Sequence, residues 1–130
     1  MATESTESKS RSAKVIAFAN QKGGIGKTTS AINVAAELGH MGYKVLLIDL
    51  DPQGNTTSGV GANKRGIKST VYDVLISRAD IGTACVKTIF ENLWLLPANM
   101  SLAGAEFELV ASENREERLR QALQSGKDSF

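Results

Sequence analysis

The chain has 130 residues, of which 42% are hydrophobic and 22% are charged, and its formal net charge is +1. This composition suits one globular domain or part of one, and a charge this close to zero gives no strong field that would point to nucleic acid or to a membrane surface. Cys85 is the only cysteine, which excludes an internal disulfide, a paired-cysteine redox centre and a four-thiolate metal site, so we interpret Cys85 as a buried, inert side chain.

The first residues are rich in Ser, Thr, Glu and Lys and contain no apolar core. They therefore do not form a secretion signal, and no later apolar run is long enough to span a membrane. We predict a disordered tail over residues 1–12, one domain over residues 13–130, and a cytoplasmic location.

A strand, a helix and a second strand follow the tail. Val15–Ala19 (VIAFA) predicts a short buried strand, and glycines come directly after it. From Lys27 the apolar residues follow a helical pattern, which ends at Gly39 or Gly42. Lys44–Leu50 (KVLLIDL) predicts a second strand, buried on both faces as parallel strands are. Strand, glycine loop, helix and strand make a βαβ unit, which predicts an α/β fold, a parallel sheet with flanking helices. The glycine-rich loop between strand and helix makes the P-loop NTPase type the predicted one.

The rest of the chain contains the signals of only one more strand, fewer than a complete fold of this type needs. Thr70 and Asp73 have the spacing of a capping box, which predicts a helix to about Ser77. We also predict a long functional loop at residues 53–69, a third strand at residues 92–96, and helices at residues 102–110 and 113–124. Residues 81–90 are ambiguous. Because doubly wound folds commonly have five or more strands, we expect the chain to be the N-terminal portion of such a domain.

The stretch NQKGGIGKTT has the features of a phosphate-binding loop. Glycines let backbone N–H groups approach an anion, and the loop leads into a helix N-terminus, which favours negative charge. Its sequence context, after an apolar strand and before a helix with an apolar face, favours this interpretation over a simple glycine-rich turn. A dinucleotide-binding fingerprint fits less well, because Thr29 stands where its third glycine belongs. The predicted nucleotide-binding residues are Lys22, Gly23, Gly24, Ile25, Gly26, Lys27, Thr28 and Thr29.

Three side chains of this loop have distinct predicted roles. Lys27 would reach the β- and γ-phosphates, and the Thr28 hydroxyl would ligate Mg²⁺. Lys22 precedes the loop and is not required by the ordinary motif. It is either a solvated surface lysine or a residue that reaches a nucleotide held by a second subunit.

Two aspartates follow the second predicted strand. Asp49 and Asp51 stand two residues apart, so in a strand they would share a face and both carboxylates would point toward the phosphates. One of them would hold Mg²⁺ through water, and the other would orient or deprotonate the attacking water. The competing interpretation is that Asp51 and Pro52 only begin a turn.

The stretch KGGIGKT, together with VLLIDLDPQGNTTSGVG, YDVL and LLPANMSLAGAEFEL, resembles the ParA/Soj chromosome and plasmid partition ATPases of the deviant Walker A superfamily. This resemblance covers nearly everything after the tail. It implies that Lys22 is the signature lysine, which crosses the interface of an ATP-bound dimer, and that Lys27 and Asp51 complete the catalytic set, with Asp51 activating water. It further implies that Asp49 lies in the outer shell of the metal and that Gln53, Gly54 and Asn55 form a switch loop.

The resemblance also implies a function. A ParA-like protein binds and hydrolyses ATP with Mg²⁺, dimerises on ATP, meets a ParB-like partner, and binds DNA nonspecifically through regions mostly beyond residue 130, which would associate it with the nucleoid. Two alternatives remain: a MinD-like membrane-cycling ATPase, and a non-catalytic nucleotide-binding fragment. An electron-transfer or metal-carrier relative would need paired cysteines, and Cys85 is alone.

Overall fold

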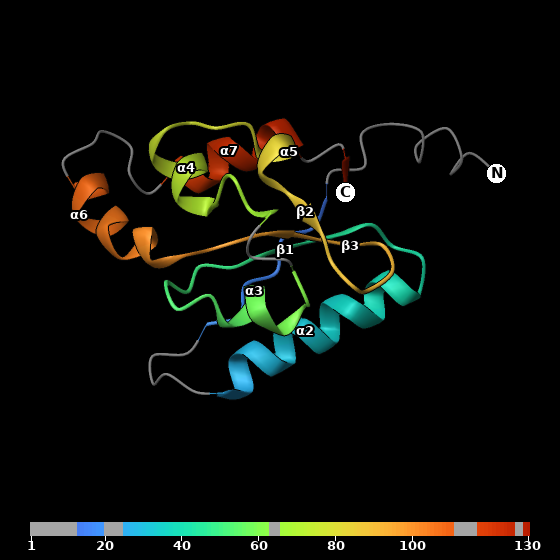
Figure 1. Ribbon diagram of the computed structural model, residues 1–130. Helices are drawn as coiled ribbons and strands as arrows, with labels where there is room; N and C mark the ends of the chain where they lie inside the picture. The colour runs from blue at the N-terminus through green and yellow to red at the C-terminus, as the bar shows by residue number, and fades with distance from the viewer. Residues whose placement is uncertain (1–12, 20–24, 63–65, 111–116, 127–128) are drawn as a thin grey trace, which may run out of the picture.

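A computed structural model describes residues 13–19, 25–62, 66–110, 117–126 and 129–130, and the predicted tail lies outside them (Figure 1). Its described strands are short and follow the first long helix. The described elements, in chain order, are α2 (Ile25–His40), β1 (Val45–Ile48), α3 (Asn55–Gly59), α4 (Val71–Ile76), α5 (Ile81–Ala84), β2 (Val86–Lys87), β3 (Leu93–Leu96), the 3₁₀ helix η2 (Met100–Gly104), α6 (Ala105–Val110) and α7 (Arg118–Gly126).

The three described strands form one mixed sheet in the order β1-β3-β2. Strands β1 and β3 are parallel, with Val45 opposite Leu93 and Ile48 opposite Leu96, which confirms the predicted parallel pairing. Strand β2 pairs with β3 in the antiparallel direction, an edge that the sequence did not predict. The fold class is therefore confirmed, with one short antiparallel strand added to the parallel pair.

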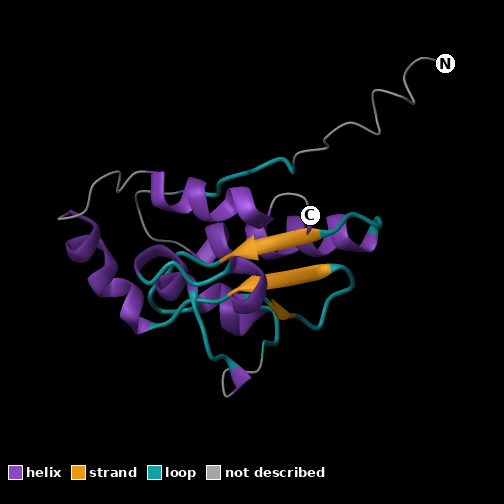
Figure 2. Ribbon diagram, turned by 90° about the horizontal axis from the view of Figure 1, so that it is seen from above, coloured by secondary structure: helices purple, strands orange, loops and turns teal. Residues whose placement is uncertain are grey.

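The alternation of side chains along the strands gives the sheet two apolar faces. Leu93 and Leu95 of β3 pack with Ala35 of α2, whereas Leu96 packs with Val74 and its neighbours on α4, α5 and α7. Helices therefore cover both faces of the sheet, and Figures 1 and 2 show this layered arrangement. Because both faces are covered, β3 can be apolar at every position, and Leu93, Leu95 and Leu96 are almost completely buried.

The predicted first strand, Val15–Ala19, is wrong for this structure. These residues have no strand assignment, and the side chains of Val15 and Ile16 are 66% and 65% exposed. An apolar run predicts a buried strand only if another strand lies beside it to accept its backbone hydrogen bonds. Among the described residues, the sheet consists of β1, β3 and β2, and none of these strands pairs with Val15–Ala19.

Helix predictions from local signals agree with the structure more closely. The capping box is confirmed: the Asp73 carboxylate accepts the Thr70 backbone N–H at 2.8 Å, and α4 begins at the next residue. The predicted helix at 102–110 is divided between η2 and α6, and the described part of the predicted helix at 113–124 lies in α7. Helix α3 was missed inside the predicted loop, and the ambiguous segment contains both α5 and β2.

Gly39 is a point of close backbone contact that should tolerate no side chain. Its carbonyl accepts a hydrogen bond from the Asn92 amide at 3.0 Å, and a Cβ at Gly39 would collide with the backbone carbonyl of Glu91. We expect Gly39→Ala to lower the free energy of unfolding by about 1–3 kcal/mol, the usual cost of overpacking. Urea denaturation would measure the change.

Gly104→Ala is the matched control for this prediction. The nearest atom to a Cβ at Gly104 is the Glu108 Oε1, at 3.8 Å, an ordinary contact distance. A Gly39→Ala protein as stable as the Gly104→Ala protein would contradict the contact between α2 and the turn before β3.

Candidate functional site

The N-terminus of α2 and the carboxyl ends of the parallel strands lie at the same edge of the molecule. Residues 41–44 connect the end of α2 to the start of β1, and α2 packs against β1. The helix therefore runs back along the strand, which brings its first turn to the end at which β1 finishes (Figure 1). Ligands of open α/β sheets bind at this edge.

The described half of the predicted phosphate loop forms the first turn of α2. Ile25 to Thr29 are helical, and the predicted residues Lys22, Gly23 and Gly24 lie outside the described residues. Lys27 and Thr28 are partly buried, and the first turn contains no acidic side chain. An ammonium group at the positive end of a helix dipole is unfavourable unless an anion is near, so the electrostatics of this turn suit a phosphate.

Asp49 is a buried carboxylate that accepts hydrogen bonds from residues that follow it in the chain. Its side chain is 2% exposed. Oδ2 accepts the Thr57 backbone N–H at 2.9 Å and the Thr57 hydroxyl at 2.7 Å, and Oδ1 accepts the Asp51 backbone N–H at 2.9 Å. These charge-assisted hydrogen bonds compensate the cost of burying the charge and attach the end of β1 to α3.

The Asp51 carboxylate is more open than that of Asp49 and is held by the loop that follows it. Its Oδ1 accepts the Gln53 backbone N–H at 3.0 Å, and its Oδ2 accepts the Asn55 side-chain amide at 2.9 Å. Gly54, between these two donors, has a φ of 69° and precedes the first residue of α3. The predicted switch residues Gln53, Gly54 and Asn55 are thus brought together around Asp51.

The expectation that Asp49 and Asp51 share one face is wrong, because β1 ends at Ile48, before either aspartate. Alternation applies only inside a strand, and here the chain turns so that Asp49 points inward to α3. An outer-shell role in magnesium binding still fits the donors present. Asp49 Oδ1 accepts one hydrogen bond from the protein and retains a lone pair for a metal-bound water.

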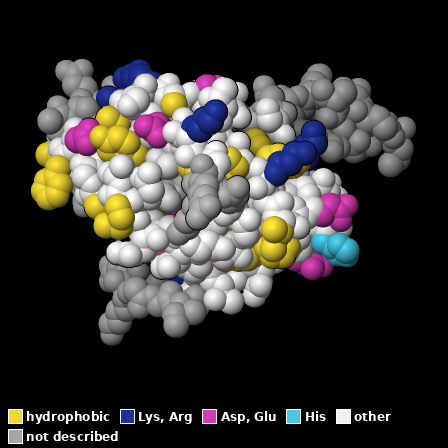
Figure 3. All heavy atoms as spheres, in the orientation of Figure 1, with side chains coloured by type: hydrophobic (Ala, Val, Ile, Leu, Met, Phe, Trp, Pro, Cys, Tyr) yellow, Lys and Arg dark blue, Asp and Glu magenta, His cyan; other side chains and the backbone are white. Residues whose placement is uncertain are grey.

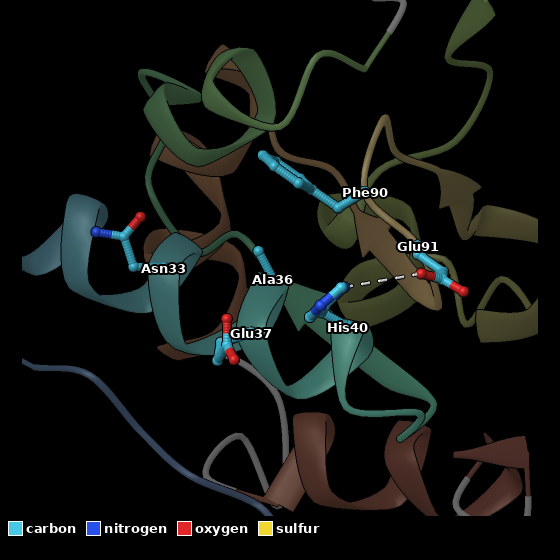
Figure 4. Close-up of a pocket in the computed structure, with 6 residues that line it drawn as sticks. All are labelled: Asn33, Ala36, Glu37, His40, Phe90 and Glu91. Atoms are coloured by element: carbon cyan, nitrogen blue, oxygen red, sulfur yellow. Dashed lines mark ion pairs between the residues drawn. The ribbon is translucent and has the colours of Figure 1, made fainter.

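A hollow on the surface lies away from these residues. It has a volume of about 580 Å³ and is formed by the last turns of α2 and the turn before β3 (Figure 4). The His40 Nδ1 lies 4.0 Å from the Glu91 Oε2 across this hollow, and both side chains are more than two-thirds exposed. None of the predicted site residues lines this hollow, which is formed by Asn33, Ala36, Glu37, His40, Phe90 and Glu91.

The predicted burial of Cys85 is confirmed only in part, because the residue is half-buried in the structure. Burial, with a smaller effect of the Asp80 charge, raises the pKa of Cys85 to about 11, so the group is an uncharged thiol near neutral pH.

On the face in Figure 3, the described basic and acidic side chains are interspersed, without a field of one sign. None of the described helices is long and apolar enough to cross a membrane.

Thr57 is the site residue that sequence reasoning missed. It is fully buried, and its hydroxyl donates to Asp49 and accepts the Ala98 backbone N–H at 3.1 Å. A buried polar residue inside a glycine-rich polar stretch gives no periodic signal. Its spacing of eight residues from Asp49 is the one signal in the sequence for this contact. That spacing brings the two residues together only if the residues of α3 form a helix.

The chain is similar to several known proteins over most of its length. A family model described as an AAA domain matches residues 13–130. The Sporulation initiation inhibitor protein Soj of Bacillus subtilis is 49% identical over 117 residues, and the Chromosome partitioning protein ParA of Caulobacter vibrioides is 47% identical over 112 residues. A crystal structure of Cobyrinic Acid a,c-diamide synthase from Mycobacterium smegmatis, with a bound ATP analog and magnesium, superposes with a TM-score of 0.80 at 42% identity.

These similarities cover most of this chain and less than half of each relative. The matched regions are 90% of the chain for Soj, 86% for ParA and 86% for the synthase. They correspond to 46%, 42% and 46% of those proteins.

Proposed function

Because this chain belongs to the AAA domain family that matches residues 13–130, we propose that the full-length protein carrying it is a ParA/Soj-type partition ATPase. It binds ATP and Mg²⁺, hydrolyses the γ-phosphate, and acts in the segregation of a chromosome or plasmid. One observation carries this proposal: the first turn of α2 brings Lys27 and Thr28 to the sheet edge beside which Asp51 stands.

The residues of the chain divide the work of hydrolysis between binding and proton transfer. The Lys27 ammonium and the backbone N–H groups at the start of α2 hold the phosphates. The positive charge of the ammonium and the helix dipole both attract the negative phosphates. Thr28 and, as an outer-shell residue, Asp49 would hold Mg²⁺, which would supply charge neutralisation on the phosphates.

Asp51 serves as the base. It accepts a proton from a water molecule as that water's oxygen bonds to the γ-phosphorus and the bond from phosphorus to the bridging oxygen breaks. The bond electrons remain with the ADP product, and Asp51 then releases the proton to solvent. Gln53 and Asn55 keep the Asp51 carboxylate oriented throughout, with hydrogen bonds of 3.0 and 2.9 Å.

Lys22 acts across a dimer interface. A second cationic side chain beside Lys27 is unfavourable within one subunit, and a nucleotide held by a second copy of the chain would offer it an anionic partner. ATP would then join two copies, and the ATP-bound dimer would bind DNA nonspecifically and respond to a ParB-like partner. These steps would associate the protein with the nucleoid in the cytoplasm.

Lys22→Ala in the full-length protein tests the dimer. We expect the variant to bind ATP with an affinity within a few-fold of the wild type and to remain monomeric with ATP and Mg²⁺, because it loses only the group that reaches the second subunit. Light scattering after size-exclusion chromatography would measure the mass with and without ATP.

Lys14→Ala is the control for charge, since Lys14 is an exposed lysine of the same N-terminal region. Wild-type dimerisation by the Lys22→Ala protein would contradict the role of Lys22. A wild-type protein that shows no ATP turnover would contradict the proposed function itself.

A further inference from the structure

Thr57 is the described residue with the most consequential unassigned contacts. It stands on α3, is 0% exposed, and uses both hydrogen-bonding functions of its hydroxyl. The hydroxyl donates to Asp49 Oδ2 at 2.7 Å and accepts the backbone N–H of Ala98 at 3.1 Å. One side chain therefore connects the end of β1, helix α3 and the segment that follows β3.

A continuous chain of hydrogen bonds runs from Thr57 to Asp51. Asp49 receives the Thr57 hydroxyl on Oδ2, and on Oδ1 it receives the Asp51 backbone N–H at 2.9 Å. From the other side, Asn55 stands two residues before Thr57 on the same helix and donates its amide to Asp51 Oδ2 at 2.9 Å. The backbone of Asp51 is thus bonded to Asp49, and its carboxylate is bonded to α3 through Asn55. Thr57 belongs to α3 and is also bonded to Asp49.

The packing around α3 leaves few alternatives to this attachment. The helix has only five residues, too few to be stable alone, and no side-chain hydrogen bond caps its N-terminus. At its start, Gly54 is buried against the carbonyl of Ala98, which a Cβ would approach to 3.2 Å. Gly54 and Asn55 attach the start of α3 to Asp51, and the backbone N–H and hydroxyl of Thr57 attach the helix to Asp49. Of these groups, the Thr57 hydroxyl is the one that also reaches the segment after β3, through Ala98.

We propose that Thr57 is a positioning residue for ATP hydrolysis: its hydroxyl fixes Asp49 and α3, and through them it holds Asp51 in line with the attacking water. This inference rests on the proposed function. Its physical basis is that a base displaced by about 1 Å can lose on the order of 100-fold in rate. Thr57 acts through Asp49 and α3, since the partners of its side chain are Asp49 and the backbone of Ala98.

The test compares Thr57→Val with Thr57→Ser in the full-length protein. Valine has the shape of threonine without the hydroxyl, and we expect it to lower kcat by about 10- to 100-fold while the Kd for ATP changes by less than about threefold. Serine keeps the hydroxyl and loses the methyl group, so we expect kcat to stay near the wild-type value even where the melting temperature falls. Thr56→Val is the matched control, because Thr56 is a buried threonine of the same helix that is not a partner of Asp49.

A double-mutant cycle separates positioning from general support of the fold. If Thr57 acts through Asp51, then Thr57→Val should cause no further loss of turnover in an Asp51→Asn background. A merely structural role would lower turnover by the same factor in both backgrounds, and that result would overturn the proposal.

Two further results would also overturn it. One is a Thr57→Val protein with wild-type kcat. The other, which remains measurable if the valine variant does not fold, is a Thr57→Ser protein whose kcat falls in step with its stability. Each result, with wild-type turnover intact, refutes the positioning role alone, whereas a wild-type protein without turnover refutes the proposed ATPase function and with it the role of Thr57.

Discussion

Asp51→Asn is expected to lower ATP turnover by about 10²–10⁴-fold, the range over which a general base contributes to a rate. Asparagine has nearly the same shape and keeps one oxygen that can accept the Gln53 backbone N–H, which the Asp51 carboxylate accepts at 3.0 Å. It cannot take up a proton from water. Because the phosphate contacts come from the first turn of α2, the affinity for ATP should change little. Release of inorganic phosphate from the full-length protein measures the first quantity, and titration with a fluorescent ATP analogue measures the second.

Asp80→Asn is the control for the loss of a negative charge. Asp80 is exposed, and its side chain makes no capping hydrogen bond to α5. Its replacement should leave turnover unchanged. Turnover within about threefold of wild type in the Asp51→Asn protein would remove Asp51 from the role of base, since the lower limit for that role is about 100-fold.

Lys27→Ala is expected to have opposite effects on binding and on stability. Removing one ammonium that makes charge-assisted contacts to phosphate should weaken ATP binding by about 10- to 100-fold, since such hydrogen bonds contribute about 1.5–3 kcal/mol. In the absence of nucleotide, the same change removes a cation from the positive end of the α2 dipole, and alanine is a better helix former. The free protein should therefore be more stable, by about 0.3–1 kcal/mol.

Isothermal titration calorimetry with ATP and Mg²⁺, and thermal unfolding without them, measure the two effects of Lys27→Ala. Lys44→Ala, at an exposed lysine just before β1, should change neither. Unchanged ATP affinity in the Lys27→Ala protein would contradict the assignment of a phosphate site to α2, and a loss of stability in the free protein would contradict the electrostatic account of its first turn.

Local signals in the sequence predicted the long helix, the parallel pair of strands and the start of α4. The apolar face of α2, the apolar runs of β1 and β3, and the capping box of Thr70 and Asp73 each depend on residues close in sequence, and each is found in the structure. The same is true of the order of elements that brings the first turn of α2 to the edge where β1 ends. These features need only periodicity and short-range hydrogen bonds.

Features that depend on distant partners were not predictable in the same way. Val15–Ala19 is apolar enough for a strand, yet whether it becomes one depends on a neighbour that hydropathy does not reveal. Helix α3 begins after a glycine with positive φ and buries threonines, so neither its cap nor its pattern indicated a helix. The inward orientation of Asp49 follows from its bonds to Thr57, eight residues away, and not from strand alternation.

The chemistry of Cys85 has a practical consequence for attaching a label to α3. As the only cysteine, with its pKa raised to about 11, this thiol is almost entirely un-ionised at pH 7 and reacts slowly with maleimides and iodoacetamides. A cysteine introduced at exposed Ser58, on α3, would have an ordinary thiol and would take up a fluorophore selectively. Within this chain, the introduced thiol would therefore be labelled with little competition from Cys85.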